Sequence, residues 1–231
     1  SLRKTRKAVM LITEILARNA RMYGRETALI ERAPEIGRRM EITWEAFDHQ
    51  ANAIAQALMD RGIRKGDRVV HLMMNCIQWL PTYFGILRTG AWAVPLNFRF
   101  VAKTIANCTH TAEAKAFIFG EEFIDRVEKI RNEIKSSVQT FIFTGPEKMR
   151  PSWAESLEEL IDDYPGIEPN VPIDICDDAA LYFTSGTTGT PKATRLTHRN
   201  LEHACYAENR HHNQTHTDNF LCIPPLYHTG A

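Results

Sequence analysis

Residues 90–143, GAWAVPLNFRFVAKTIANCTHTAEAKAFIFGEEFIDRVEKIRNEIKSSVQTFIF, decide the fold class. Three short apolar runs, AWAVPL, AKAFIFG and VQTFIF, recur at intervals of about 24 residues with helix-like segments between them. A parallel pair of strands needs a crossover of this kind, because its connection must return the chain to the same end of the sheet. We therefore predict an α/β fold with layered, parallel-rich sheets flanked by helices.

The segment before this stretch continues the alternation. A helix is predicted to begin after Thr43 and to end at Gly62. KGDRVVHLMMN then predicts a turn and a strand, and CIQWLPTYFGILRTG and EEFIDRVEKIRNEIKS predict crossover helices, with a kink or a late start at Pro81. The apolar face of the first helix has its residues at i, i+4, i+7 and i+11: Phe47, Ala51, Ile54 and Leu58.

The opening SLRKTRKAVMLITEILARNA is basic and then apolar, but Thr13 and Glu14 interrupt the apolar run at once. We interpret it as an amphipathic helix and not as a signal peptide. No stretch reaches the roughly 18 apolar residues that a membrane span needs, so no integral membrane segment is predicted. The residues expected on the apolar face of this helix are Ala8, Leu11, Ile15 and Met22.

Composition limits the classes of function. The chain has 231 residues, and Lys plus Arg equal Asp plus Glu at 28 each, so no overall field attracts nucleic acid. The sequence contains no C-x-x-C pair, which favours reduced thiols and a cytoplasmic protein. The five cysteines are widely spaced: Cys76, Cys108, Cys176, Cys205 and Cys222.

Proline-rich, aperiodic residues 164–178 predict an extended connector. We accordingly divide the chain into an amino-terminal α/β subdomain over 1–163, the connector, and the start of a second α/β subdomain over 179–231.

A loop rich in Gly and Thr follows, in LYFTSGTTGTPKATRLTHRN, residues 181–200. ALYF predicts a strand and THRNLEHACYAENRHH predicts a helix with Thr197 as N-cap, which places the loop at a strand-to-helix turn. Gly186 and Gly189 allow backbone amides to converge, the hydroxyls add donors, and Lys192 adds a charge, as a polyphosphate site requires. The alternative is a flexible Gly/Thr linker. The spacing matches neither a Walker loop nor G-x-G-x-x-G.

YFTSGTTGTPKATRLTHRN resembles the phosphate-binding signature of adenylate-forming enzymes, [ST]-S-G-[ST]-T-G-x-P-K-G. The region from ITWEAFDHQ to PLNFRF is similar to the amino-terminal region of acyl-CoA ligases. PLYHTGA is similar to the segment in which a histidine or aromatic residue lies between nucleotide and acyl pocket, which implies a catalytic position for His228. The residues that the resemblance assigns to the β- and γ-phosphates of ATP are Thr184, Ser185, Gly186, Thr187, Thr188, Gly189 and Lys192.

The resemblance implies ATP-dependent activation of a carboxylic acid to an acyl adenylate, with Mg²⁺ assisting and pyrophosphate released. The thiol of coenzyme A then displaces AMP. Fatty or aromatic acids are the expected substrates. The alternatives are an adenylating enzyme that uses a carrier-protein thiol, and a catalytically inactive module that binds nucleotide or a partner.

Two features depart from the family pattern. Ala193 stands where the signature has glycine, and the added methyl group restricts the backbone if positive φ is needed there. The chain also corresponds to only the amino-terminal portion of the family, without the later adenine- and ribose-binding segments and the mobile carboxy-terminal domain. We expect this portion to be inactive alone.

Histidines near the carboxyl end raise the possibility of a zinc site. His212 and His216 stand at i and i+4, close to His203 and His211. No H-E-x-x-H pattern or cysteine pair accompanies them, so we predict a polar helix end with exposed imidazoles and no metal site.

Overall fold

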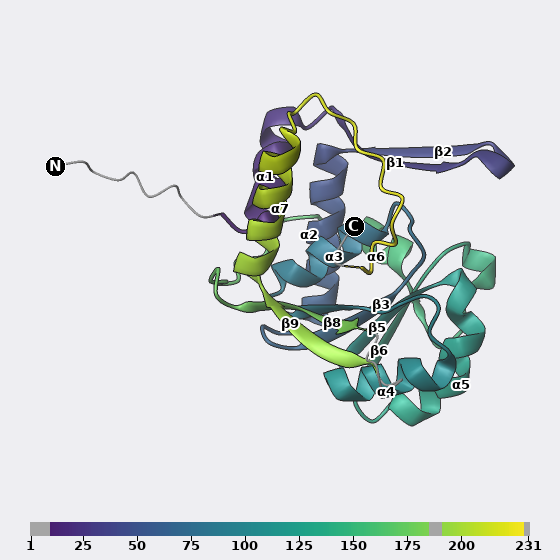
Figure 1. The fold of residues 1–231 in the computed structure, drawn as a ribbon. Helices are drawn as coiled ribbons and strands as arrows, with labels where there is room; N and C mark the ends of the chain where they lie inside the picture. Colours follow the sequence, from purple (N-terminus) through teal and green to yellow (C-terminus); the bar gives the residue numbers. More distant parts are fainter. Residues whose placement is uncertain (1–9, 185–190, 229–231) are drawn as a thin grey trace.

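A seven-stranded sheet forms the centre of the computed structural model, which describes residues 10–184 and 191–228 (Figure 1). The strand order is β7-β6-β5-β3-β4-β8-β9, and every neighbouring pair is parallel except β8 and β9. The predicted parallel-rich α/β fold is confirmed. The strands are β3 (Arg68–Leu72), β4 (Trp92–Pro95), β5 (Ala116–Gly120), β6 (Thr140–Thr144), β7 (Glu155–Ser156), β8 (Asp178–Thr184) and β9 (Lys192–Thr197).

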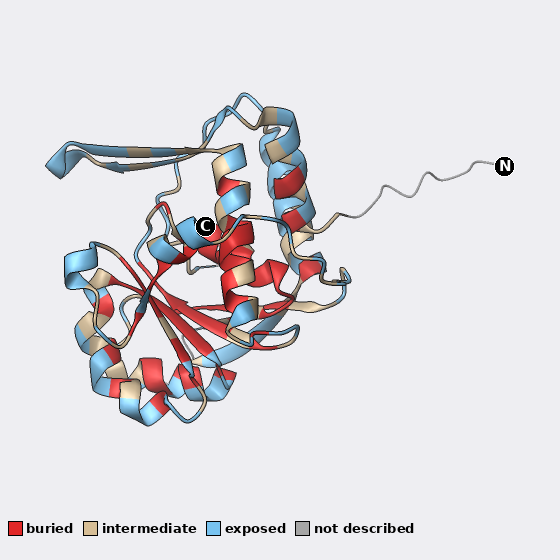
Figure 2. Cartoon of the chain, turned by 180° about the vertical axis from the view of Figure 1, so that it is seen from behind, coloured by how far each residue is buried: buried red, intermediate tan, exposed pale blue. Residues whose placement is uncertain are grey.

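Helices cover both faces of the sheet, and the buried residues concentrate between the layers (Figure 2). One face carries α1 (Ile12–Tyr23), α2 (Trp44–Asp60), α3 (Trp79–Arg88) and α6 (Leu157–Asp163). The other face carries α4 (Ala102–Ala112) and α5 (Ile124–Ile134). α7 (His198–His212) lies beside α1 (Figure 1). Short 3₁₀ turns occur at Pro34–Ile36, Glu121–Phe123 and Glu147–Met149.

The predicted helix after Thr43 is confirmed in detail. The hydroxyl of Thr43 accepts a hydrogen bond from the backbone N–H of Ala46 at 3.1 Å and so caps α2. Gly62 follows the helix with φ +85°. Pro81 is the third residue of α3, in the first turn, where a missing N–H costs no intrahelical hydrogen bond, so the predicted late start is also confirmed.

Ala8 of the predicted apolar face lies outside the described residues, and the part of this face within α1 is wrong by about one position. Met22 is 60% exposed and Leu11 is the N-cap residue of α1. The orientation follows from packing of α1 against α2 and α3, which the periodicity of one isolated helix does not report. The residues of α1 that are buried are Ile12, Thr13, Leu16 and Ala17.

A two-stranded antiparallel hairpin, β1 (Thr27–Ala33) and β2 (Arg38–Thr43), follows α1 and precedes α2 along the chain and projects to the right in Figure 1. Neither strand contains a fully buried residue, and the sequence analysis did not predict the hairpin. Residues 165–174 contain no helix or strand, as expected of a connector. β8 and β9 beyond it join the same sheet as β3 to β7, and the division at 164–178 remains a prediction.

All five cysteines are free thiols. In the described ranges, no helix has the length and apolar character needed to cross a bilayer.

α2 and α3 are in close contact at Gly85. A Cβ atom at this position would lie 2.8 Å from both Cβ and Cγ2 of Ile54 and 3.0 Å from the carbonyl oxygen of Ala51. Alanine would gain up to about 1 kcal/mol in helix propensity, but overpacking costs about 1–3 kcal/mol. Gly85→Ala is therefore expected to lower the free energy of unfolding by about 1 kcal/mol in a urea titration. A higher free energy of unfolding for Gly85→Ala would show that α2 and α3 can shift apart to accept the methyl group without loss of stability.

Candidate functional site

The Gly/Thr-rich loop connects two antiparallel strands. Thr184 ends β8 and Lys192 begins β9; the two residues are register partners, and the Thr184 hydroxyl donates to the Lys192 carbonyl at 3.4 Å. Both side chains are exposed. The predicted strand-to-helix turn is therefore wrong, because β9 intervenes before α7. The other assigned residues lie outside the described residues: Ser185, Gly186, Thr187, Thr188 and Gly189.

β9 escaped prediction because its residues, KATRLT, are mostly polar and exposed and form no apolar run. Pairing with β8 makes them a strand. The predicted start of α7 is confirmed, since the Thr197 hydroxyl accepts from the Asn200 backbone N–H at 3.3 Å and the Asn200 side chain accepts from the Thr197 N–H at 2.9 Å.

Ala193 fits its backbone position. It lies in β9 opposite Phe183, and positive φ among the described non-glycine residues occurs only at Glu113 and Asn213. The methyl group therefore imposes no left-handed strain, and this departure from the family signature gives no structural reason for an inactive loop.

The sheet topology brings the loop to an edge suited to ligands. β8 runs parallel to β4, and β4 runs parallel to β3, so their carboxyl ends lie at the same edge. The chain passes from β3 to β4 in one direction and from β4 across to β5 in the other. Such a reversal creates a crevice between β3 and β5 at the carboxyl ends of the strands, the edge at which open α/β sheets bind their ligands.

The segment that contains His228 crosses this edge. Asn75, three residues after β3, donates from Nδ2 to the Pro224 carbonyl at 3.0 Å and accepts from the Leu226 N–H at 2.9 Å. The ring of Tyr227 packs edge-on against Phe98, which follows β4, at 5.1 Å between centroids. The structure thus brings His228, which is exposed, to the edge where Thr184 and Lys192 lie.

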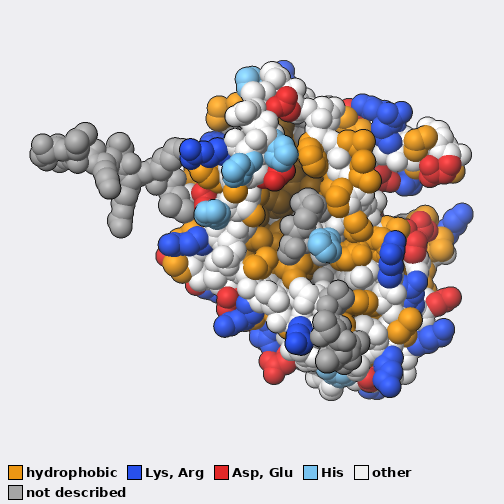
Figure 3. All heavy atoms as spheres, viewed as in Figure 1, with side chains coloured by type: hydrophobic (Ala, Val, Ile, Leu, Met, Phe, Trp, Pro, Cys, Tyr) orange, Lys and Arg blue, Asp and Glu red, His pale blue; other side chains and the backbone are white. Residues whose placement is uncertain are grey.

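Apolar side chains surround this region. On the face shown in Figure 3, hydrophobic side chains gather around a hollow in the middle, and charged side chains lie toward the rim. The carboxy-terminal segment also exposes apolar side chains: Phe220, Leu221 and Ile223 are 68%, 77% and 78% exposed. Apolar side chains around a hollow suit the hydrocarbon part of an organic acid better than a charged phosphate group.

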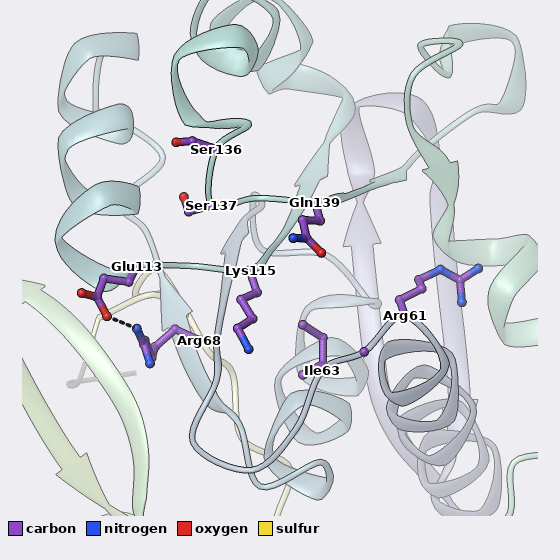
Figure 4. A pocket seen from close by; sticks show the side chains of 9 residues that line it. Arg61, Ile63, Arg68, Glu113, Lys115, Ser136, Ser137 and Gln139 are labelled. Carbon is purple, nitrogen blue, oxygen red and sulfur yellow. Dashed lines mark hydrogen bonds and ion pairs between the residues drawn. The ribbon is translucent and has the colours of Figure 1, made fainter.

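Two cavities among the described residues lie at opposite ends of the strands. One, of about 380 Å³, is at the opposite edge of the sheet and is lined by Arg68 and Lys115 (Figure 4). Arg68 is paired with Glu113, and Lys115 with Asp67 at 2.7 Å, so this cavity offers little uncompensated positive charge for a polyphosphate. The other, of about 240 Å³, lies at the carboxyl ends of β3, β5 and β6 beside the Asn75 loop, and the carboxylates that line it disfavour phosphate.

Within residues 10–184 and 191–228, no three His, Cys, Asp or Glu side chains form a group that could hold a metal ion. His212 pairs instead with Glu208 at 3.2 Å, and His216 stacks on Tyr23 at 6.3 Å between ring centroids.

Below the edge, β3 contains a buried histidine. His71 is 1% exposed, packs 4.7 Å from Trp79 and 5.9 Å from Tyr83 between ring centroids, and has no hydrogen-bond partner for either ring nitrogen among the described residues. Because burial penalises the charged imidazolium, the pKa of His71 falls to about 3.

This lowered pKa predicts acid sensitivity. Between pH 6.5 and about 3, the unfolded state binds a proton at His71 that the folded state does not, so stability falls as pH is lowered through this range. We expect a loss of about 2 kcal/mol between pH 7 and pH 5 from this residue. His71→Phe should flatten the dependence of unfolding free energy on pH. An unchanged slope would assign the effect to other groups, such as His198, whose pKa burial also lowers.

Comparison with known proteins agrees with this geometry. The family model described as AMP-binding enzyme matches residues 16–231. Crotonobetaine/carnitine–CoA ligase of Proteus mirabilis is 27% identical over 212 residues, which cover 90% of this chain and 40% of that protein. The chain thus spans about 40% of the length of the curated relatives it matches.

Two solved structures share the fold. An anthranilate–CoA ligase in complex with anthranoyl-AMP has a TM-score of 0.75 at 26% identity, over 83% of this chain and 35% of that chain. The inhibitor-bound N-terminal domain of FACL13 from Mycobacterium tuberculosis has a TM-score of 0.79 at 28% identity, over 94% of this chain and 52% of that chain.

Proposed function

Because this chain belongs to the AMP-binding enzyme family, we propose that the whole protein activates a carboxylic acid with ATP and transfers the acyl group to coenzyme A. The observation that supports the proposal is that the Thr184–Lys192 hairpin end and the segment before His228 both lie at the carboxyl edge of the sheet. The ligase names of the relatives and the anthranoyl-AMP complex of a structural neighbour support the same reaction class.

Two displacements make up the reaction. A carboxylate oxygen attacks the α-phosphorus of ATP, the bond to the bridging oxygen breaks, and pyrophosphate leaves with its electron pair. The sulfur of coenzyme A then attacks the acyl carbon, the bond to the AMP oxygen breaks, and the thiol proton passes to solvent. The first step gains from groups that neutralise the charge developing on pyrophosphate.

The loop residues would supply that neutralisation. Lys192 contributes a full charge, and the hydroxyls and amides of Thr184 and residues 185–189 contribute donors to the β- and γ-phosphates. His228 would lie between nucleotide and acid. Mg²⁺ that accompanies ATP would be bound by the phosphates together with one or two carboxylates, and we assign no carboxylate of this chain to it.

The substrate class and cellular setting extend the proposal. We propose a fatty or aromatic acid, since the apolar hollow suits either, and a cytoplasmic location. Transfer to a carrier-protein thiol is the competing activity. An inactive nucleotide-binding module is the third possibility, although Ala193 no longer favours it.

Pyrophosphate release tests the proposal. The longest natural chain that contains this sequence is incubated with ATP, Mg²⁺ and pools of carboxylic acids, without and with coenzyme A, and the 231-residue chain is assayed beside it. We expect release that requires an acid, an acyl-CoA product when coenzyme A is present, and no release from the 231-residue chain alone. Acid-dependent release without an acyl-CoA product would favour a carrier thiol. Absence of release by folded protein across all pools would refute adenylation.

A further inference from the structure

We infer that Asn75 is a positioning residue, which sets the place of His228 at the site edge by fixing the backbone of residues 224–226. The inference rests on the proposed function for its catalytic consequence. The contact itself joins residues 149 and 151 positions apart, so it is a tertiary connection between two loops.

The side-chain amide suits this contact because both of its ends are used. Nδ2 donates to the Pro224 carbonyl at 3.0 Å, while Oδ1 accepts from the Leu226 N–H at 2.9 Å. Two bonds from one planar group fix the orientation of the segment as well as its distance. Aspartate has the same shape but only accepts, and leucine does neither.

The loop that contains Asn75 is itself held at its far end. Glu31 of β1 accepts a hydrogen bond from the Ile77 backbone N–H at 2.8 Å, and the Trp79 N–H donates to the Cys76 carbonyl at 3.1 Å where α3 begins. Asn75 therefore projects from a short loop that is anchored between β3 and α3 and braced by the hairpin. A rigid base is what a positioning contact needs.

The segment continues directly from this contact to His228. Tyr227, the next residue after Leu226, packs on Phe98 at 5.1 Å, and the His228 N–H donates to the Pro225 carbonyl at 3.0 Å in a tight turn. The turn between Pro225 and His228 thus has the Asn75 contact at its start and the aromatic contact near its end. Loss of the Asn75 bonds would remove two hydrogen bonds between this turn and the loop after β3, while Leu226 and Tyr227 would still pack against the apolar core.

Amide exchange tests the contact without any assay of activity. In the longest natural chain, Asn75→Leu and Asn75→Asp are compared with Asn209→Ala, which removes a local side-chain bond to the Gln214 carbonyl at the end of α7. We expect exchange in peptides covering 224–228 to accelerate about three- to tenfold in Asn75→Leu, the effect of one amide hydrogen bond, and to stay unchanged in the control. Unchanged exchange in both Asn75 variants would overturn the inference.

Steady-state kinetics test the consequence. A misplaced His228 should raise the KM for the acid and lower kcat, for a combined loss in kcat/KM on the order of 10- to 100-fold, with the KM for ATP unchanged. If the substitution only reduced the fraction of folded protein, the apparent kcat would fall while both KM values stayed unchanged. Asn75→Asp, which keeps the acceptor, should show a smaller loss than Asn75→Leu.

The two proposals fail in different ways. A wild-type protein that releases no pyrophosphate refutes the proposed function, and the exchange measurement still decides whether Asn75 holds the segment. An active wild-type protein with normal acid KM in Asn75→Leu refutes the positioning role alone.

Discussion

Asp48→Ala is expected to lower the free energy of unfolding by about 3 kcal/mol or more, because it leaves a buried guanidinium without its counter-charge. The Arg88 side chain is 2% exposed, and its Nη2 lies 2.6 Å from Asp48 Oδ1. Arg88 also donates to Asn52 Oδ1 at 2.7 Å and to the carbonyl oxygens of Asp48 and Thr13 at 3.0 and 3.2 Å. This network ties α1, α2 and α3 together below the sheet face that they cover.

Chemical denaturation at pH 7 measures the change, and Glu128→Ala provides a matched control. Glu128 pairs with Arg131 on the surface of α5 at 3.6 Å, with side chains 50% and 30% exposed, and its removal should cost at most about 0.5 kcal/mol. The double variant Asp48→Leu, Arg88→Met should recover much of the loss, since it removes both charges. Equal effects of Asp48→Ala and Glu128→Ala would mean that the buried pair stabilises no more than a surface one.

Lys192→Ala is expected to lower the rate of acid-dependent pyrophosphate release by about 100- to 1,000-fold, the usual cost of removing one group that stabilises transition-state charge. Lys192 begins β9, and its exposed side chain is accessible to the triphosphate that we propose this protein binds. Because the charge matters most as pyrophosphate departs, the effect should fall on kcat more than on the KM for ATP.

Arg195→Ala is the matched control for this charge. Arg195 lies on the same strand, is 66% exposed and pairs with Asp178 at 3.1 Å, so its loss removes a cation from β9 at a position farther from the loop. We expect the turnover of the Arg195→Ala variant to differ little from that of the wild-type protein. Lys192→Arg should retain part of the activity, since it keeps the charge but not the compact ammonium. Similar losses in Lys192→Ala and Arg195→Ala would indicate a general electrostatic effect of β9 and would remove Lys192 from the site.

The sequence by itself determined those elements whose signals are local. α2 was predicted from the cap at Thr43 and the spacing of its apolar residues, and β3 to β6 from short apolar runs separated by crossover helices. Strands buried on both faces need continuous apolar runs, and a helix needs its own period, so both patterns are present in the residues themselves. The loop could be proposed as a phosphate site for the same reason, because glycines, hydroxyls and a lysine lie within nine residues, 184–192, and that assignment stays a prediction.

Only the tertiary structure decided the features that depend on distant partners. β9 is polar and exposed, and it is a strand because β8 lies beside it. The buried face of α1 was set by packing on α2 and α3, and the β1–β2 hairpin has no buried residue that would mark it in the sequence. The Asn75 contact joins residues 149 positions apart. Periodicity and turn chemistry report neighbours along the chain, whereas these contacts form only when the sheet brings separate loops to one edge.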